Sequence, residues 1–400
     1  MKIKKIFLKL TLLLLLCGVL LNLPAQANKI DIHFWYSIPP EYSPLMSRLI
    51  EEFNQKKAYY NVIPRNFESQ EELFNALMKG DEVPNVALIN AGWQSTLVNT
   101  GRIEMLEDIM DKVGSTLKVI FKMDTFKSIL KTAYYKDKIW SMPFYAVNYA
   151  ILYNPDILKT YKLKAPPKTW AELLEVGKKI KKNGGYVITI PANSDVRELG
   201  RIFASFLMQY GGDLSDSGAE EYAKVMSFYS DLVNKHNICA IEDINTDKVL
   251  MFIGDAQDYL DYKRKGVNLK AAPMLKHNKR ASYIDAYNLV IFKSDKLDPM
   301  KAWNFIYWIS EFQRSLIWSL ETPYLPAHKQ VTLSPGYFQF LQDNPDMRVF
   351  LSELKVGNTE TDLYNYEVSI KKIGESFKMV IRGSKNPSEG SHSAKSATEK

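Results

Sequence analysis

Apolar and polar side chains alternate from Ile30 onward. Ile30, Ile32 and Phe34 fall on one face of an extended chain and the residues between them fall on the other, which predicts a β-strand. A helix is expected to begin at Ser43, because serine is a favoured N-cap and the proline that follows suits the first helical turn. Apolar residues then recur at helical spacing and form the stripe that this helix buries.

Strand and helix patterns keep alternating through the first third of the chain. Tyr60–Pro64 and Asn85–Ile89 are predicted strands, and the second is continuously apolar, as strands buried on both faces are. Glu71–Lys79 and Trp93–Asn99 have helical spacing. This alternation predicts an α/β layer with a largely parallel sheet.

The same alternation returns in the middle of the chain. Thr169 and Glu172 have the spacing of a capping box, which predicts a helix start, and a strand at Tyr186–Ile190 follows the glycine pair that ends this helix. Another helix is expected over residues 196–210. The chain is too long for one hydrophobic core and suits two lobes. Residues 384–400 are rich in Ser, Gly, Lys and Glu without apolar periodicity, so we expect a disordered tail there.

The leader, Met1–Ala27, has the order of a secretory signal peptide: lysines, an apolar stretch and a small-x-small exit at Ala25-Gln26-Ala27. We therefore expect cleavage after Ala27 and export to the periplasm. A membrane anchor is one alternative, but Lys9 interrupts the apolar run, which is short for a membrane span. Lipidation at Cys17 is another, but Leu16 stands where a small residue would be needed.

Charge and cysteine content narrow the class of protein. The formal net charge of +7 includes four lysines of the leader, so the exported chain is close to neutral. A near-neutral chain gives no reason to expect a nucleic-acid partner. Cys17 leaves with the leader and Cys239 remains alone, which excludes an internal disulfide and a cysteine metal cluster in the exported chain.

Common catalytic and cofactor motifs do not occur in the sequence. It contains no G-x-S-x-G, H-E-x-x-H, P-loop, G-x-G-x-x-G or C-x-x-C pattern, and its five histidines lie far apart. We therefore predict neither an enzyme nor a metal site, and no cofactor. A pair of opposed carboxylates, as in a glycosidase, leaves no local motif, so a secreted carbohydrate-active enzyme stays an alternative from another class.

Several short segments, taken in their order and spacing, resemble those of a known family. The most specific pair is Leu152-Tyr153-Asn154-Pro155-Asp156 followed by Pro166-Pro167-Lys168-Thr169-Trp170. The others are Phe34–Ser37, Pro84–Leu88, Pro143–Asn148, Ala302–Ile306 and Tyr324–Ala327. Together they resemble the extracellular solute-binding proteins of ABC importers, in the branch that binds maltose and glycerol-3-phosphate, over about residues 29–387.

The resemblance implies a type II periplasmic-binding-protein fold, in which two α/β lobes with parallel-rich sheets are joined by crossing strands near Val147–Ile151, Ala272–Met274 and Leu325–Ala327. Lobe 1 would hold residues 28–146 and 275–325, and lobe 2 residues 147–274 and 326–383. In such proteins a small-molecule ligand between the lobes stabilises a closed state, which docks on the transmembrane subunits of an ABC permease. No cofactor is implied, and we expect a monomer.

Eight side chains are candidates for the ligand site. Ligands of open α/β sheets bind beyond the carboxyl ends of strands, which selects Ser37 after the first strand and Trp93 in the turn after the third. Trp93 is expected to stack on the ligand, with packing in the core as the alternative. Asn148 lies on the first crossing, either as a hydrogen-bonding group or as a hinge cap. The resemblance adds a further five residues: Ser69, Asp255, Gln257, Asn288 and Tyr324.

One position argues against a phosphate ligand. The phosphate-binding arginine of the glycerol-3-phosphate binder aligns with Ile370, which has no charge, and Lys371 and Lys372 point in other directions on a helix. We therefore expect a neutral sugar or polyol. Glycerol-3-phosphate or a glycerophosphodiester, held by one of the two lysines, stays the alternative within the family. A binding scaffold retained for adhesion or sensing is a third interpretation.

Overall fold

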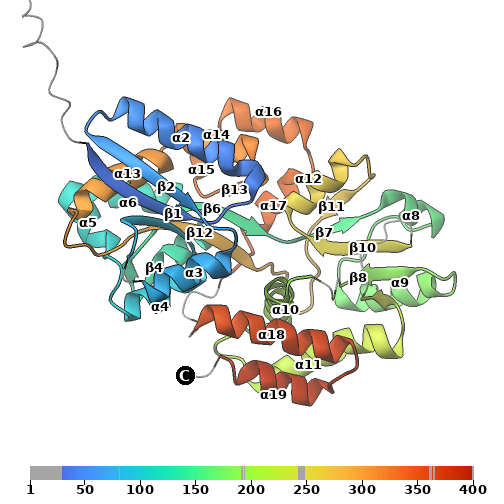
Figure 1. Cartoon of the computed structure of the whole chain (residues 1–400). Coiled ribbons are helices and arrows are strands. Elements are labelled where there is room, and N and C mark those ends of the chain that lie inside the picture. Colours follow the sequence, from blue (N-terminus) through green and yellow to red (C-terminus); the bar gives the residue numbers. More distant parts are fainter. Residues whose placement is uncertain are drawn as a thin grey trace, which may run out of the picture.

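The computed structural model describes residues 29–398 apart from positions 81, 191, 193, 242–247, 360–362 and 364. The predicted signal peptide lies outside these residues and stays a prediction. Helices and strands form two lobes, each built on a sheet of its own (Figure 1). No helix in the described segments is long and apolar enough to cross a membrane.

Lobe 1 is built on a six-stranded sheet in the order β13-β6-β12-β3-β1-β2. The strand predicted from Ile30 is confirmed, with Ile32 and Phe34 buried and the alternate residues Asp31 and His33 exposed. Strand β1 is parallel to β2 and β3, whereas β12 and β6 are antiparallel neighbours. The strands are β1 (Ile30–Tyr36), β2 (Tyr60–Asn66), β3 (Val86–Asn90), β6 (Met142–Asn148), β12 (Ile284–Ile291) and β13 (Leu325–Pro326).

The helices predicted for lobe 1 are present. Helix α2 (Ser43–Lys56) buries its apolar stripe, and Ser69 caps α3 (Gln70–Lys79) by accepting a hydrogen bond from the backbone N–H of Glu72. The predicted helix at 93–99 is the short turn η2 (Ala91–Trp93) with α4 (Gln94–Asn99). The other elements are η1 (Pro40–Tyr42), α5 (Leu106–Val113), α6 (Ser115–Asp124), α7 (Lys127–Leu130), η3 (Lys131–Ala133), the hairpin β4 (Tyr134–Tyr135) and β5 (Lys138–Ile139), α13 (Pro299–Ser310) and α14 (Phe312–Glu321).

Lobe 2 is built on a five-stranded sheet in the order β11-β7-β10-β8-β9. The predicted capping residue Thr169 accepts a hydrogen bond from the backbone N–H of Glu172, and the helix that begins there is α9 (Trp170–Lys181). The strands are β7 (Ala150–Tyr153), β8 (Tyr186–Thr189), β9 (Cys239–Ala240), β10 (Val249–Gly254) and β11 (Lys270–Ala272). The other helices include α8 (Pro155–Thr160), α10 (Val196–Tyr210), α11 (Ala219–Ser230), η4 (Asp231–Lys235), α12 (Ala256–Arg264) and α18 (Tyr366–Ile381).

The chain passes between the two sheets in three places. Tyr149 joins β6 of lobe 1 to β7 of lobe 2, and residues 273–283 lead from β11 back to β12. After β13 the chain forms α15 (Lys329–Thr332), α16 (Pro335–Asp343) and α17 (Met347–Glu353), of which α17 packs against β7 and β11. Apolar side chains of both lobes meet around these crossings.

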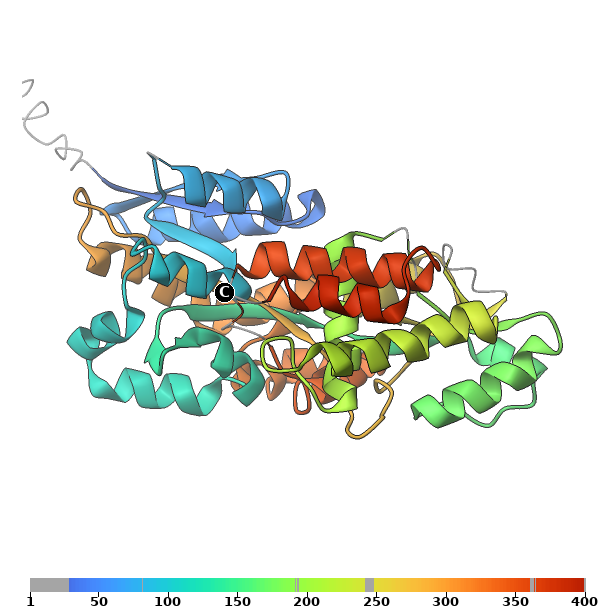
Figure 2. The ribbon, with the colours of Figure 1, turned by 90° about the horizontal axis from the view of Figure 1, so that it is seen from below.

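The predicted disordered tail over 384–400 is wrong for most of its length, because Pro387–Lys395 forms helix α19. Figure 2 shows α19 lying beside α18, and α19 also packs against α11. The buried face consists of small residues, Gly390, Ser391 and Ala394, which let the helices approach closely. A Cβ at Gly390 would lie 2.2 Å from a methyl carbon of Val380. The helix was not predicted because its buried face contains small residues and no large apolar ones.

Candidate functional site

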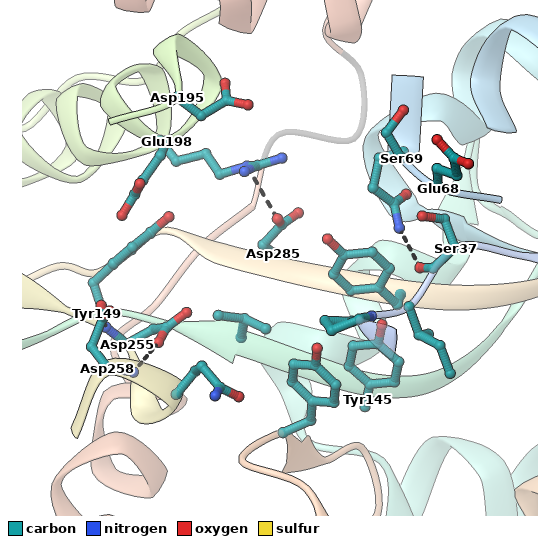
Figure 3. Close-up of a pocket in the computed structure, with 18 residues that line it drawn as sticks. Ser37, Glu68, Ser69, Tyr145, Tyr149, Asp195, Glu198, Asp255, Asp258 and Asp285 are labelled. Carbon is teal, nitrogen blue, oxygen red and sulfur yellow. Dashed lines mark hydrogen bonds and ion pairs between the residues drawn. The ribbon is translucent and has the colours of Figure 1, made fainter. Parts of the chain in front are cut away.

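A pocket of about 500 Å³ lies between the two lobes, where strand ends of lobe 1 face α10 and α12 of lobe 2. Its lining is polar and aromatic, and Figure 3 shows that side chains from both lobes point into it. Ser37 and Ser69 are on the lobe 1 side, whereas Glu198 and Asp255 come from lobe 2. A ligand in this pocket would therefore contact both lobes at once.

Three tyrosines form a stacked row along the lobe 1 side of the pocket. The ring of Tyr145 on β6 is stacked between those of Tyr287 on β12, 4.7 Å away, and Tyr324 just before β13, 4.4 Å away. The row exists because these strands are neighbours and Tyr145 pairs with Tyr287 in register. Since the rings stack on one another, their hydroxyl groups are the parts left for a ligand. Burial raises the pKa of each hydroxyl, which keeps all three protonated.

Two of the pocket's tyrosines have no hydrogen-bond partner for their hydroxyl groups. Tyr145 is 2% exposed and Tyr149, at the crossing between the lobes, is 4% exposed. Both line the pocket, and neither hydroxyl is hydrogen-bonded to another residue of the described chain. Neither hydroxyl is among the buried polar atoms that lack a partner, because both open onto the pocket, where their hydrogen-bonding capacity is unused by the protein. A bound molecule with hydroxyl or amino groups could form hydrogen bonds with both of them.

Carboxylates dominate the lobe 2 side of the pocket. Asp255 and Asp258 cap the N-terminus of α12, where each accepts a hydrogen bond of 3.0 Å from the backbone N–H of the other. Glu198 lies on α10. Burial, and next the charge of Asp258, raise the pKa of Asp255 to about 8 and that of Glu198 to about 7. These groups are therefore partly protonated near neutral pH while the pocket is empty.

Arg201 is the one cationic side chain that lines the pocket among the described residues. Its Nε lies 3.1 Å from a carboxylate oxygen of Asp285, whose other oxygen accepts a hydrogen bond from Asn90. Burial raises the pKa of Asp285, although Arg201 opposes this shift. Arg201 is not among the site residues predicted from the sequence, because the sequence places it only within the expected helix over 196–210. A charged residue inside the apolar run 199–207 was the available signal.

Five of the eight predicted site residues line this pocket: Ser37, Ser69, Asp255, Gln257 and Tyr324. The other three do not. Trp93 is 1% exposed, packs on Phe74 and donates a hydrogen bond from its indole nitrogen to Glu367, which is the core-packing alternative and leaves it outside this pocket. Asn148 is buried, and its amide nitrogen donates a hydrogen bond to the backbone carbonyl of Phe350. It therefore caps backbone near the crossing, the alternative role expected for it, and does not line the pocket.

Asn288 is buried on the side of β12 that faces away from the pocket. Its amide nitrogen donates to the hydroxyl groups of Thr132 and Ser141. Because side chains alternate along a strand, Asp285 and Tyr287 point into the pocket and Asn288 points away from it. The prediction selected the right strand segment and the wrong face.

The residues discussed for phosphate binding lie away from the pocket. Ile370 is buried in α18 against Gly200, and neither Lys371 nor Lys372 lines the pocket. The cation that does reach the pocket, Arg201, comes from α10 instead of α18.

This chain matches a protein-family model and is similar in sequence to proteins of known function. A family model described as bacterial extracellular solute-binding protein matches residues 48–348. The sn-glycerol-3-phosphate-binding periplasmic protein UgpB of Agrobacterium fabrum is 26% identical over 162 residues, which cover 38% of this chain and 36% of that protein. The chain therefore matches little more than a third of the length of this relative.

Solved structures are similar over nearly the whole chain. UgpB from Mycobacterium tuberculosis, in complex with glycerophosphocholine, has a TM-score of 0.78 at 19% identity and covers 92% of this chain and 97% of its own. The sugar-binding protein MalE from Xanthomonas citri has a TM-score of 0.76 at 18% identity, with 92% and 96% covered. These similarities confirm the predicted two-lobe periplasmic-binding-protein fold.

Proposed function

This chain belongs to the bacterial extracellular solute-binding proteins, and we propose that it captures a carbohydrate or polyol between its lobes and delivers it to the permease of an ABC importer. The row of tyrosine hydroxyls that faces carboxylates across the interlobe pocket carries this proposal. Hydroxyl-rich ligands need many hydrogen-bond partners at fixed positions, which the tyrosine hydroxyls and carboxylates of this pocket offer. A ligand that bridges the lobes stabilises the state in which the lobes are together.

A phosphate ligand is the alternative within the family, and the similarity to glycerol-3-phosphate-binding UgpB favours it. Arg201 is then the residue that would hold the phosphate. Its guanidinium is already paired with Asp285, and the other charges around the pocket are negative, so a phosphate would be repelled by most of its surroundings. The charge balance therefore supports a ligand without a phosphate.

A secreted carbohydrate-active enzyme is the alternative from another class. The pocket contains several carboxylates, and hydrolysis of a sugar would require two of them on opposite sides of the scissile bond. Recovery of the ligand decides between binding and turnover. In a binding protein the ligand leaves the pocket chemically unchanged, whereas an enzyme releases a shorter product.

The proposal includes a periplasmic monomer released by cleavage after Ala27. Intact mass of the exported protein should correspond to a chain that begins at Asn28. An uncleaved leader or a lipid-modified Cys17 would contradict this part of the proposal and leave the binding function untouched. Gel filtration with light scattering measures the oligomeric state.

The function is tested by a thermal-shift screen of neutral sugars, polyols and their phosphates. A ligand at about 100 times its dissociation constant stabilises a protein by about 2.7 kcal/mol, which such a screen detects. Hits are followed by calorimetry, by small-angle scattering for compaction, and by mass spectrometry of the recovered ligand. Conversion of the ligand would overturn the proposal in favour of an enzyme, and binding of phosphorylated polyols alone would favour the alternative within the family.

A further inference from the structure

The charges that line the interlobe pocket do not balance. Six carboxylates line it, from Glu68, Asp195, Glu198, Asp255, Asp258 and Asp285, against the single guanidinium of Arg201. Arg201 is paired with Asp285 at 3.1 Å, and Asp195 lies 3.6 Å from Arg197. The lobe 2 group of Glu198, Asp255 and Asp258, called here the carboxylate cluster, forms no ion pair with a pocket-lining residue of the described chain, although the charge of Arg201 acts favourably on Glu198.

The carboxylate cluster is only partly explained by the fold. The N-terminal backbone of α12 stabilises Asp255 and Asp258 through its cap, whereas Glu198 lies in the first turn of α10 and gains only the favourable field of that helix N-terminus. Burial raises the pKa of all three side chains, the charge of Asp258 raises the pKa of Glu198 and Asp255 further, and Asp261 acts in the same way on Asp258. Partial protonation relieves the repulsion while the pocket is empty, and a positive charge brought by a ligand would stabilise the ionised carboxylates instead.

A metal ion does not fit this arrangement. No group of three or more His, Cys, Asp or Glu side chains in the described part of the chain is placed to hold a metal ion. The carboxylates face a pocket of about 500 Å³, which is far larger than one ion needs. The space suits an organic molecule whose charge reaches the cluster from the pocket side.

The tyrosines give a second and independent indication of a ligand at this place. Tyr149 is 4% exposed, its hydroxyl has no partner in the described chain, and Figure 3 shows it at the same end of the pocket as Glu198, Asp255 and Asp258. Tyr145, with a hydroxyl equally without a partner, lines the same pocket. Hydroxyl oxygens accept hydrogen bonds from an ammonium group, and tyrosine rings attract cations.

We propose that the natural ligand is a small hydroxylated cation, with a protonated amino or quaternary ammonium group seated against Glu198, Asp255 and Asp258 and hydroxyl groups toward Tyr145 and Tyr149. This inference rests on the proposed solute-binding function and adds the charge of the ligand. The hydroxyl groups of an amino sugar or amino alcohol would satisfy the tyrosines, and its cation would complete the carboxylate cluster.

Calorimetric titration with two matched pairs of probes tests the inference: glucosamine against glucose, and choline against glycerol, near neutral pH. We expect the cationic member of a pair to bind at least about tenfold more tightly than the neutral one, and added salt to reduce this ratio. Equal or tighter binding of the neutral member overturns the inference and leaves the solute-binding function in place. Failure of all four probes to bind counts against both.

A double variant shows whether the carboxylate cluster causes the selectivity. Glu198→Gln with Asp255→Asn removes two charges and keeps the side-chain oxygen with which Asp255 caps α12. The ratio of cationic to neutral affinity should fall to within about twofold, while Glu175→Gln, an exposed change on α9 of the same lobe, should leave it unchanged. An unchanged ratio in the folded double variant overturns the assignment. If the double variant does not fold, the ratio and its salt dependence in the unmodified protein decide the question.

Discussion

Arg197 of α10 and Glu71 of α3 form an ion pair of 2.6 Å that joins lobe 2 to lobe 1. Arg197 also pairs with Glu367 of α18, which accepts the hydrogen bond of Trp93. A second contact between the lobes is made where the hydroxyl of Tyr42 donates to the side-chain carbonyl of Gln257, a pocket residue, at 2.5 Å. The lobes are thus held together by polar contacts as well as by any ligand between them.

Loss of the Arg197–Glu71 pair should weaken ligand binding without abolishing it. Glu71 is about half exposed, so the pair stabilises the joined lobes by only about 0.5–1 kcal/mol, and Glu71→Gln should reduce affinity about two- to fivefold. Calorimetry measures the affinity, and small-angle scattering measures the separation of the lobes. Arg48→Gln, which breaks the Arg48–Glu321 pair within lobe 1, is the matched control and should change neither. Identical effects of the two variants would contradict a role in joining the lobes.

Removal of the Tyr145 hydroxyl should affect binding and leave stability unchanged. Because this hydroxyl has no partner in the described chain, Tyr145→Phe removes no protein hydrogen bond, and we expect the unfolding midpoint to stay the same or rise. Ligand affinity should fall by about 1–1.5 kcal/mol, the contribution of one hydrogen bond. Tyr337→Phe removes another buried hydroxyl without a partner, outside the pocket, and should leave affinity unchanged. Normal ligand affinity of Tyr145→Phe would place the ligand elsewhere in the pocket.

Trp93 should matter for stability and not for the ligand. Trp93→Phe removes the indole N–H that donates to Glu367 at 3.0 Å and reduces packing against Phe74, which should lower the free energy of unfolding by about 1–3 kcal/mol. Affinity should stay within about twofold of the unmodified protein, since Trp93 does not line the pocket. Chemical denaturation measures the free energy of unfolding, and calorimetry on the same preparation measures the ligand affinity. A large loss of affinity in a protein of normal stability would restore the stacking role that the sequence suggested.

Glu353 should make the protein less stable as the pH rises toward neutral. This carboxyl is fully buried near Arg280, and burial raises its pKa from 4.5 to about 7. Between these two values the folded protein binds more protons than the unfolded chain, so the contribution of Glu353 to stability is present at low pH and is lost as the pH passes 7. Glu353→Gln should therefore flatten this part of the profile and stabilise the protein by up to about 3 kcal/mol above pH 7. Denaturation curves at several pH values check this, and parallel profiles for the two proteins would contradict it.

Local pattern alone was enough for most of the secondary structure. The alternation at Ile30 and the helix starts at Ser43 and Thr169 depend on residues a few positions apart, and each element lies where it was predicted. The caps differ in detail: Ser43 is the first residue of α2 and forms no capping hydrogen bond, and Glu172 accepts from the backbone N–H of Lys168 instead of that of Thr169. The rule that ligands bind beyond strand ends also selected Ser37, which lines the interlobe pocket, because the carboxyl ends of parallel strands meet at one edge of a sheet.

Only the tertiary structure decided which polar side chains face the pocket. Asn288 and Asp285 lie three residues apart on one strand, and the sequence does not say which of them points to a ligand and which to buried hydroxyls. From the sequence, Arg201 is only a charged residue within an apolar helix. Its partner Asp285 lies on β12, and the pair exists only because α10 packs near that strand. Helix α19 packs through small residues whose burial depends on α11 and α18, far away in the chain. Local spacing determines how the backbone is arranged along each element, whereas the partners of a charge, a hydroxyl or a small side chain exist only after distant elements have packed together.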